Sequence, residues 1–153
     1  MKPWERWALH LSSLAVAGSG FAYLWMKYVL ETDDPFALVN HPWQPTMLRI
    51  HVLGSPLFVL VFGIILNSHI MKKLRATGIP NRKSGLVSLG TLATMVCSGY
   101  LLQVATNQMW LRALVTAHVV SAVVFTASYG SHLVISATLV RRRPAVSPAR
   151  EVA

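Results

Sequence analysis

Acidic residues and cysteine are both scarce in this 153-residue chain. The five acidic residues all lie outside the apolar runs, and the single cysteine, Cys97, excludes an intramolecular disulfide and any metal site built from several cysteines. Charged residues make up only 12% of the chain, about half the share expected of a soluble globular domain. The net charge of +9 would suit a nucleic-acid-binding protein, but in a membrane protein the distribution of charge matters more than its total. We therefore expect no nucleic-acid partner.

The hydrophobic residues, 54% of the chain, are gathered in long runs. An α-helix needs about 20 apolar residues to cross about 30 Å of hydrocarbon. The runs therefore predict an all-α integral membrane protein, a four-helix bundle within residues 1–143. Its membrane spans are expected at about residues 7–30, 47–71, 84–105 and 111–140. Residues 144–153 are expected to form a disordered cytoplasmic tail.

Lysine and arginine are distributed unevenly between the two ends of these spans. Most of them lie at the N-terminus, between the second and third spans, and in the C-terminal tail, all on one side. The loop that carries Glu31, Asp33 and Asp34 lies on the other side. Because cytoplasmic loops carry the excess of basic residues, both termini are predicted to be cytoplasmic. The chain is thus expected to be a multi-pass protein of the bacterial inner membrane, in contact with membrane lipid.

Histidines are the polar residues that stand out within the apolar runs. A polar ring in a span is uncommon and needs a partner, which is either a neighbouring helix or a metal. His118 and His132 are fourteen residues apart, so a helix separates them by only about 40° in angle and about 21 Å along its axis. This spacing suits two stacked haems, one in each half of the membrane. Each haem iron would take its second imidazole from another helix.

Depth in the membrane indicates which histidines pair. His51 matches His118 in the outer half, and Arg49 beside it is expected to pair with haem propionates. In the inner half His132 has two candidate partners, His10 and His69. Depth favours His10, and His69 is then expected to bond a propionate, a lipid headgroup or a quinone.

Three stretches of the sequence resemble a known family. ERWALHLSS, LRIHVLGSPLFVLVFG and AHVVSAVVFTASYGSHLV resemble segments of the small four-helix di-haem cytochromes b, the group of bacterial cytochrome b561 and the cytochrome b subunits of formate dehydrogenase and nickel–iron hydrogenase. The resemblance covers nearly the whole chain, as one of spacing and topology. It implies that His10 pairs with His132 and His51 with His118, with these four residues binding the iron of two haem b groups.

The predicted function is transmembrane electron transfer between the quinone pool and a periplasmic or membrane redox partner subunit. The chain would then be an electron-transfer subunit of a membrane oxidoreductase rather than an enzyme by itself. A quinone site is expected either at the inner end of the second span, with Asn67, Ser68 and His69, or in the outer loop, with Asn40, His41 and Gln44. His41 has a simpler interpretation as an ordinary interfacial loop residue.

Two other functions remain open. The first is a haem-free membrane anchor subunit, whose histidines would serve helix packing. The second is a small transporter, which is disfavoured because proton- and cation-coupled transporters usually carry a carboxylate within the membrane.

Overall fold

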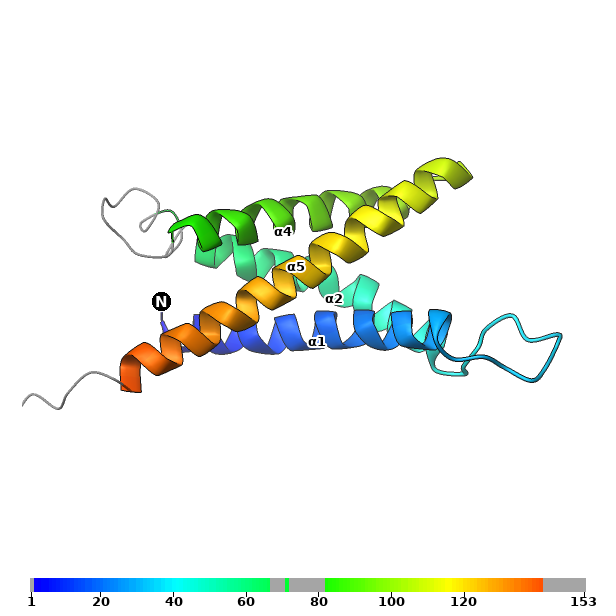
Figure 1. Cartoon of the computed structure of the whole chain (residues 1–153), viewed down its shortest axis with the longest axis horizontal. Helices are drawn as coiled ribbons and strands as arrows, with labels where there is room; N and C mark the ends of the chain where they lie inside the picture. The colour runs from blue at the N-terminus through cyan, green and yellow to red at the C-terminus, as the bar shows by residue number, and fades with distance from the viewer. Residues whose placement is uncertain (1, 67–70, 72–81, 142–153) are drawn as a thin grey trace, which may run out of the picture. The chain divides into compact units, whose positions relative to one another are not determined.

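The computed structural model of the chain describes residues 2–66, 71 and 82–141. All regular structure within these residues is helical, and they contain no strand. The helices are α1 (Pro3–Tyr28), α2 (Gln44–Ile65), α4 (Arg82–Leu102) and α5 (Gln108–Arg141) (Figure 1). Each predicted span overlaps one of them, which confirms the all-α class.

Helix α1 begins where local chemistry favours a helix start. Pro3 occupies the first turn, where a missing backbone N–H costs nothing. The Glu5 carboxylate accepts a hydrogen bond from the backbone N–H of Lys2 at 2.8 Å, and its negative charge lies at the positive end of the helix dipole. The helix closes with the Val29 N–H donating to the Trp25 carbonyl at 3.0 Å.

Two helices, α2 and the Gln108–Ile135 part of α5, are long and apolar enough to cross a membrane. In each, only 11% of the most apolar stretch is buried, whereas the core helix of a soluble protein would be mostly buried. On α2 four of the exposed apolar residues form one stripe along the helix, because their spacing follows the helical repeat. The stripe consists of Leu53, Leu57, Leu60 and Ile64. Exposed faces of this kind suit contact with lipid.

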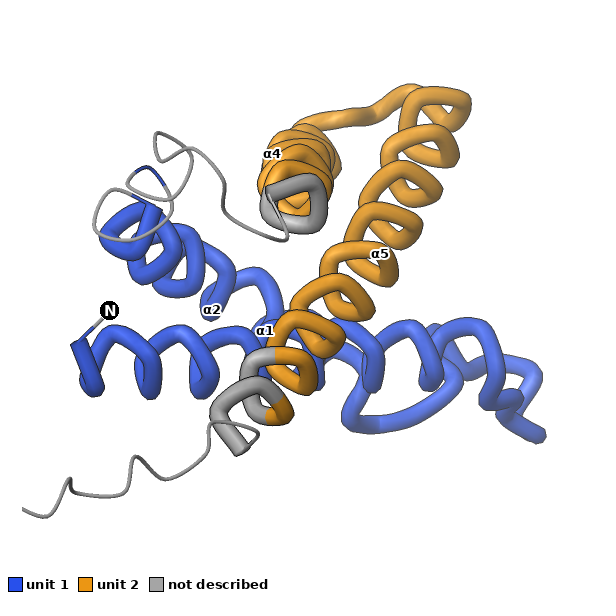
Figure 2. Tube along the Cα trace, turned by 60° about the vertical axis from the view of Figure 1, so that its left-hand side comes forward, with its two compact units in different colours: residues 1–85 blue, residues 86–153 orange. Residues whose placement is uncertain are grey.

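The chain divides into two compact units, residues 1–85 and residues 86–153 (Figure 2). In the first unit α1 and α2 pack against each other as an antiparallel pair, with Val16 against Gly54 and Gly20 against His51. In the second unit α4 and α5 also run antiparallel, and the Ser88 and Ser128 hydroxyls share a hydrogen bond of 2.7 Å between them. Each unit is thus built on a helical hairpin.

Candidate functional site

The His51 side chain crosses from α2 to the backbone of α1. Its Nδ1 lies 2.8 Å from the Val16 carbonyl oxygen. The ring rests directly over Gly20, where a Cβ atom would come within 2.8 Å of Nδ1 and 2.9 Å of Cε1. Such distances are too short for any real Cβ, so only glycine lets the imidazole approach α1 this closely.

The His118 side chain makes the same kind of contact in the second unit. Its Nδ1 lies 2.9 Å from the Met95 carbonyl oxygen of α4 and 3.2 Å from the Ser98 hydroxyl. A Cβ at Gly99 would come within 3.0 Å of Cε1 and 3.3 Å of Nδ1. The ring of His118 therefore also rests on a glycine of the neighbouring helix.

The two contacts share one design, which we call the histidine seat. On the receiving helix a carbonyl at position i meets the imidazole, a buried serine follows at i+3, and the glycine stands at i+4. Ser19 and Ser98 each donate their hydroxyl proton to carbonyls of their own helix, at 2.7 Å to Ala15 and Thr94 respectively. Each serine proton is thereby engaged within its own helix, and the Ser98 oxygen, 3.2 Å from Nδ1 of His118, is a second acceptor for that imidazole proton beside the Met95 carbonyl.

The seat determines which ring nitrogen carries the proton in each histidine. A carbonyl oxygen can only accept, so a hydrogen bond to it requires the proton on Nδ1. The lone pair of the neutral ring then lies on Nε2. Metal-ligating histidines usually donate their other ring N–H to a backbone carbonyl or carboxylate in this way, which orients the ring. Both imidazoles thus have the tautomer of an Nε2 metal ligand.

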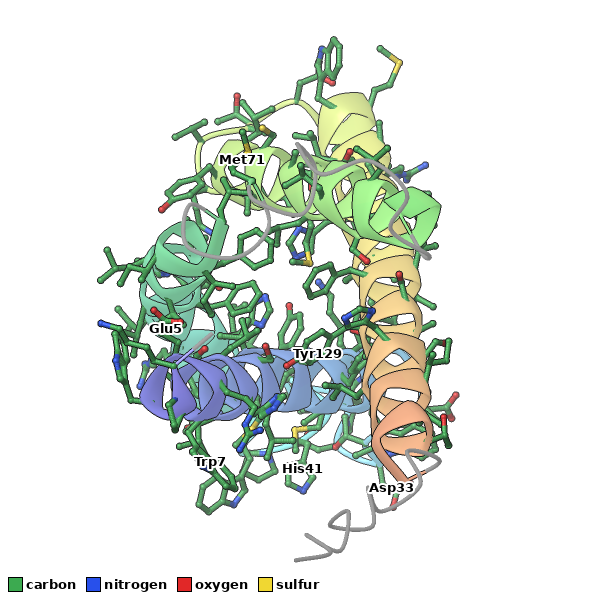
Figure 3. The ribbon with its side chains drawn as sticks, turned by 90° about the vertical axis from the view of Figure 1, so that its left-hand side faces the viewer. Glu5, Trp7, Asp33, His41, Met71 and Tyr129 are labelled. Carbon is green, nitrogen blue, oxygen red and sulfur yellow. The ribbon has the colours of Figure 1, made fainter. Side chains whose placement is uncertain are left out.

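His10 and His51 lie at different levels of the first unit. His51 meets α1 at Val16 and Gly20, whose mean position is about eight residues, or about 12 Å, along the axis from His10. Side chains of a helix lean toward its N-terminus, which moves the His10 ring further away. Two imidazoles at such different heights cannot share one iron. His10 is half-buried and meets Trp7 edge-on, with ring centroids 6.4 Å apart, while Trp7 projects outward from α1 (Figure 3).

His118 and His132 both lie on the single continuous helix α5, so the separation of about 21 Å expected from their spacing holds. His132 is exposed. If His51 pairs with His118 and His10 with His132, the two spacings should be similar. The spacing along α5 is about 21 Å, whereas His10 lies about 12 Å from the level of His51, so the depth match between His10 and His132 stays a prediction.

Arg49 is exposed near the start of α2, two residues before His51. At about 100° per residue the two side chains leave α2 about 160° apart. Pairing of Arg49 with a propionate would therefore require its long side chain to bend around the helix, and this role stays a prediction.

The polar groups of the outer loop have local partners that shape the entry to α2. The His41 Nδ1 accepts the Trp43 backbone N–H at 3.1 Å, and the His41 carbonyl accepts the N–H of Gln44 at 3.0 Å. The Asn40 amide donates to the Lys27 carbonyl at 3.0 Å, which ties the loop to the end of α1. His41, labelled in Figure 3, therefore organises the start of α2. The proposed quinone groups Asn67, Ser68 and His69 lie outside the described residues.

The sequence analysis identified the two histidines but missed the residues that seat them. A signal was present. One pattern occurs at residues 51–63 and again at 118–130. It consists of His-Val, a phenylalanine seven residues after the histidine, and an aromatic-glycine pair that begins four residues after that phenylalanine. Phe58 and Phe125 are both buried, and each ring meets the aromatic ring one turn later, at 6.2 and 6.0 Å between centroids. On the receiving helices, Ser-Gly-aromatic occurs at residues 19–21 and 98–100.

Comparison with known proteins gave no match among protein-family models, curated proteins or solved structures. The functional assignment therefore depends on the residues themselves.

Proposed function

We propose that this chain is a multi-pass, di-haem b-type cytochrome that carries electrons across the bacterial inner membrane, with His51 and His118 as the two ligands of its outer haem. The observation that supports this most strongly is the repeated histidine seat. Two helical hairpins of one chain each direct an imidazole with its proton on Nδ1 and its lone pair on Nε2. His10 and His132 are the proposed ligands of the inner haem.

The residues present fit a haem by their chemistry. A neutral imidazole that coordinates through Nε2 is a standard axial ligand of haem iron, and a bond from Nδ1–H to a carbonyl raises its basicity. The hydrogen bonds from Nδ1 to the Val16 and Met95 carbonyls fix the orientation of the two rings, and Gly20 and Gly99 leave room for them against the neighbouring helix. Haem, when bound, would supply a one-electron couple, and coordination by two histidines would leave no open iron position for oxygen chemistry. The chain's own contribution is to hold the imidazoles in fixed orientation and to surround them with apolar residues.

A haem-free anchor is the main competing function. Histidines do hydrogen-bond across helices in membranes, and such bonds stabilise helix packing by about 0.6 kcal/mol on average. One seat would be explained equally well by packing. Packing alone gives no reason for the same carbonyl, serine and glycine order to occur twice with the same ring nitrogen engaged.

The partners proposed for this cytochrome are the quinone pool and a periplasmic or membrane redox subunit. The hydrogen bonds of Asn40, His41 and Gln44 within the loop engage several of the groups that a quinone would need there. This favours the inner end of the second span for the quinone, near Asn67 and His69.

Haem stoichiometry of histidine variants tests the proposal. The chain purified from haem-replete cells should show a reduced b-type spectrum and two haems by pyridine haemochrome. His51→Ala and His118→Ala should each lose one haem, and the double variant should lose the same single haem. The remaining haem reports that the variants have folded. His41→Ala, which changes a histidine of the loop, should keep both haems.

A colourless wild-type protein, or a double variant that loses both haems while each single variant loses one, would refute the pairing. For the inner haem, His10→Ala and His69→Ala are compared in the same assay. Loss of a haem in the His10 variant alone is expected, and loss in the His69 variant alone would assign that ligand to His69.

A further inference from the structure

An open groove of about 680 Å³ runs between α4 and α5 of the second unit. Its walls come from both helices and consist of small and β-branched residues, with Arg112 as the charged residue among them. Within the part of the chain that the structure describes, no acidic residue lines the groove, and neither does His118. It is therefore separate from the histidine seat.

The hydroxyl groups in the groove wall are turned toward their own helices. Thr91 donates to the Val87 carbonyl at 2.9 Å, and Thr94 donates to the Gly90 carbonyl at 3.1 Å. On α5 the Thr116 hydroxyl donates to the carbonyl of Arg112 at 2.9 Å.

Ser121, the remaining hydroxyl residue of the wall, donates to its own helix at the Ala117 carbonyl, at 2.7 Å. With their protons engaged, these side chains present mainly carbon atoms to the groove. The guanidinium of Arg112, with five N–H donors and a fixed positive charge, is then the main group that can bind a polar ligand.

The groove has the length of one membrane leaflet. From Arg112 to Val124 it follows α5 for about 18 Å, and half of the hydrocarbon core is about 15 Å thick. Trp110, exposed at the same end of α5 two residues before Arg112, belongs to the residue type that gathers at membrane interfaces. A ligand that fits has one anionic end and a long apolar body.

We infer that this groove binds an anionic phospholipid, with the headgroup phosphate on Arg112 and an acyl chain along Ala117, Val120 and Val124. A quinone fits less well, because its two carbonyl groups lie at opposite ends of the ring and need donors at both. The groove supplies donors at one end only. The inference does not depend on haem, and it holds for an anchor protein as well as for a cytochrome.

Native mass spectrometry of the full chain tests the site. The protein is extracted into detergent and titrated with phosphatidylglycerol and phosphatidylcholine of equal chain length. The wild type should retain phosphatidylglycerol preferentially. Arg112→Gln should reduce this preference about five-fold, because a basic residue near the surface typically contributes about that much to binding of anionic lipid. Arg112→Lys should keep most of the preference, and Arg6→Gln, which removes the same charge from α1, should leave it unchanged.

The apolar part of the groove is tested separately. Val120→Phe should fill it and weaken retention of both lipids, whereas Val123→Phe, one turn away and outside the wall, should not. The inference fails if Arg112→Gln keeps the wild-type preference, or if Val120→Phe leaves lipid retention unchanged. The inference also fails if Val120→Phe displaces a bound quinone analogue while phosphatidylglycerol is still retained. Haem absorbance recorded on the same samples keeps this result distinct from that of the proposed electron-transfer function.

Discussion

A Cβ atom at Gly20 would lie only 2.8 Å from Nδ1 of the His51 ring, which is too close for an ordinary contact. We predict that Gly20→Ala pushes the imidazole away and breaks its 2.8 Å bond to the Val16 carbonyl. Overpacking of this kind typically costs about 1–3 kcal/mol. The expected result is a lower unfolding midpoint in detergent, together with loss or altered potential of one haem.

Gly18 provides the matched control on the same helix. A Cβ at Gly18 meets no atom within 4 Å, so Gly18→Ala should not disturb any contact. Alanine in the interior of a helix is more favourable than glycine by about 0.5–1 kcal/mol. Gly18→Ala should therefore leave stability unchanged or raise it, and an equal loss in both variants would contradict the role assigned to Gly20.

Gly99 tests whether the second seat has the same tolerance. The contacts that a Cβ would make with His118 are looser there, at 3.0 and 3.3 Å, and the ring has the Ser98 hydroxyl as a second neighbour. Gly99→Ala should therefore be destabilising in the same direction as Gly20→Ala but less so. Unfolding midpoints of the two variants, measured side by side, test this order.

Sequence reasoning at the level of residues found the histidines because a polar ring in an apolar run is conspicuous. It could not find Val16 or Met95 as partners, because their contribution is a backbone carbonyl that every residue possesses. Ser13 is a further example. Its hydroxyl is buried and has no hydrogen-bond partner among the described residues. No feature of the sequence distinguishes it from the neighbouring Ser12, which donates to the Ala8 carbonyl at 2.7 Å.

At the level of elements, the hydroxyl pair of Ser88 and Ser128 is a polar link between α4 and α5. A double-mutant cycle with Ser88→Ala and Ser128→Ala should give a coupling energy of about 0.6 kcal/mol, the average for such bonds in membranes. The measurement is reversible unfolding in mixed micelles. A coupling near zero would mean that the two hydroxyls, though 2.7 Å apart, contribute to stability independently.

The four helices were predictable from four long apolar runs in the sequence, because a run of that length is typical of a helix. The residues at which the helices begin were harder to predict. Helix α1 begins at Pro3 rather than at Trp7, because Pro3 and Glu5 stabilise the first turn whatever the hydropathy of the residues there. Helix α2 begins at Gln44 rather than at Met47, because the loop hydrogen bonds of His41 support its first turn.

Antiparallel pairing of α4 and α5 follows from the short connection at residues 103–107. Helices α1 and α2 are joined by the longer segment 29–43, and their opposite directions are those expected of consecutive spans. The register of each helix pair could not be predicted from the sequence, because it depends on which glycine lies against which histidine ring. The repeated Ser-Gly-aromatic and His-Val patterns mark the helices that form the two histidine seats.

At the level of the whole molecule, the proposed function requires the two ends of each helix to face opposite compartments, and this can be measured. Cys97 is the single cysteine, so Cys97→Ser gives a background for site-specific labelling. In that background Leu38→Cys lies in the loop after α1, where Leu38 is fully exposed, and Ser147→Cys lies in the C-terminal tail. A thiol reagent that cannot cross membranes should label Leu38→Cys in intact spheroplasts and Ser147→Cys only after lysis. The bias of lysine and arginine toward the termini is the physical reason.

The N-terminus is tested in the same way with Lys2→Cys. The reagent should label Lys2→Cys only after lysis, because an even number of spans returns the chain to the cytoplasm. Labelling of positions 2 and 147 from opposite sides would mean an odd number of spans. It would contradict the proposed topology while leaving the histidine seat within each hairpin intact.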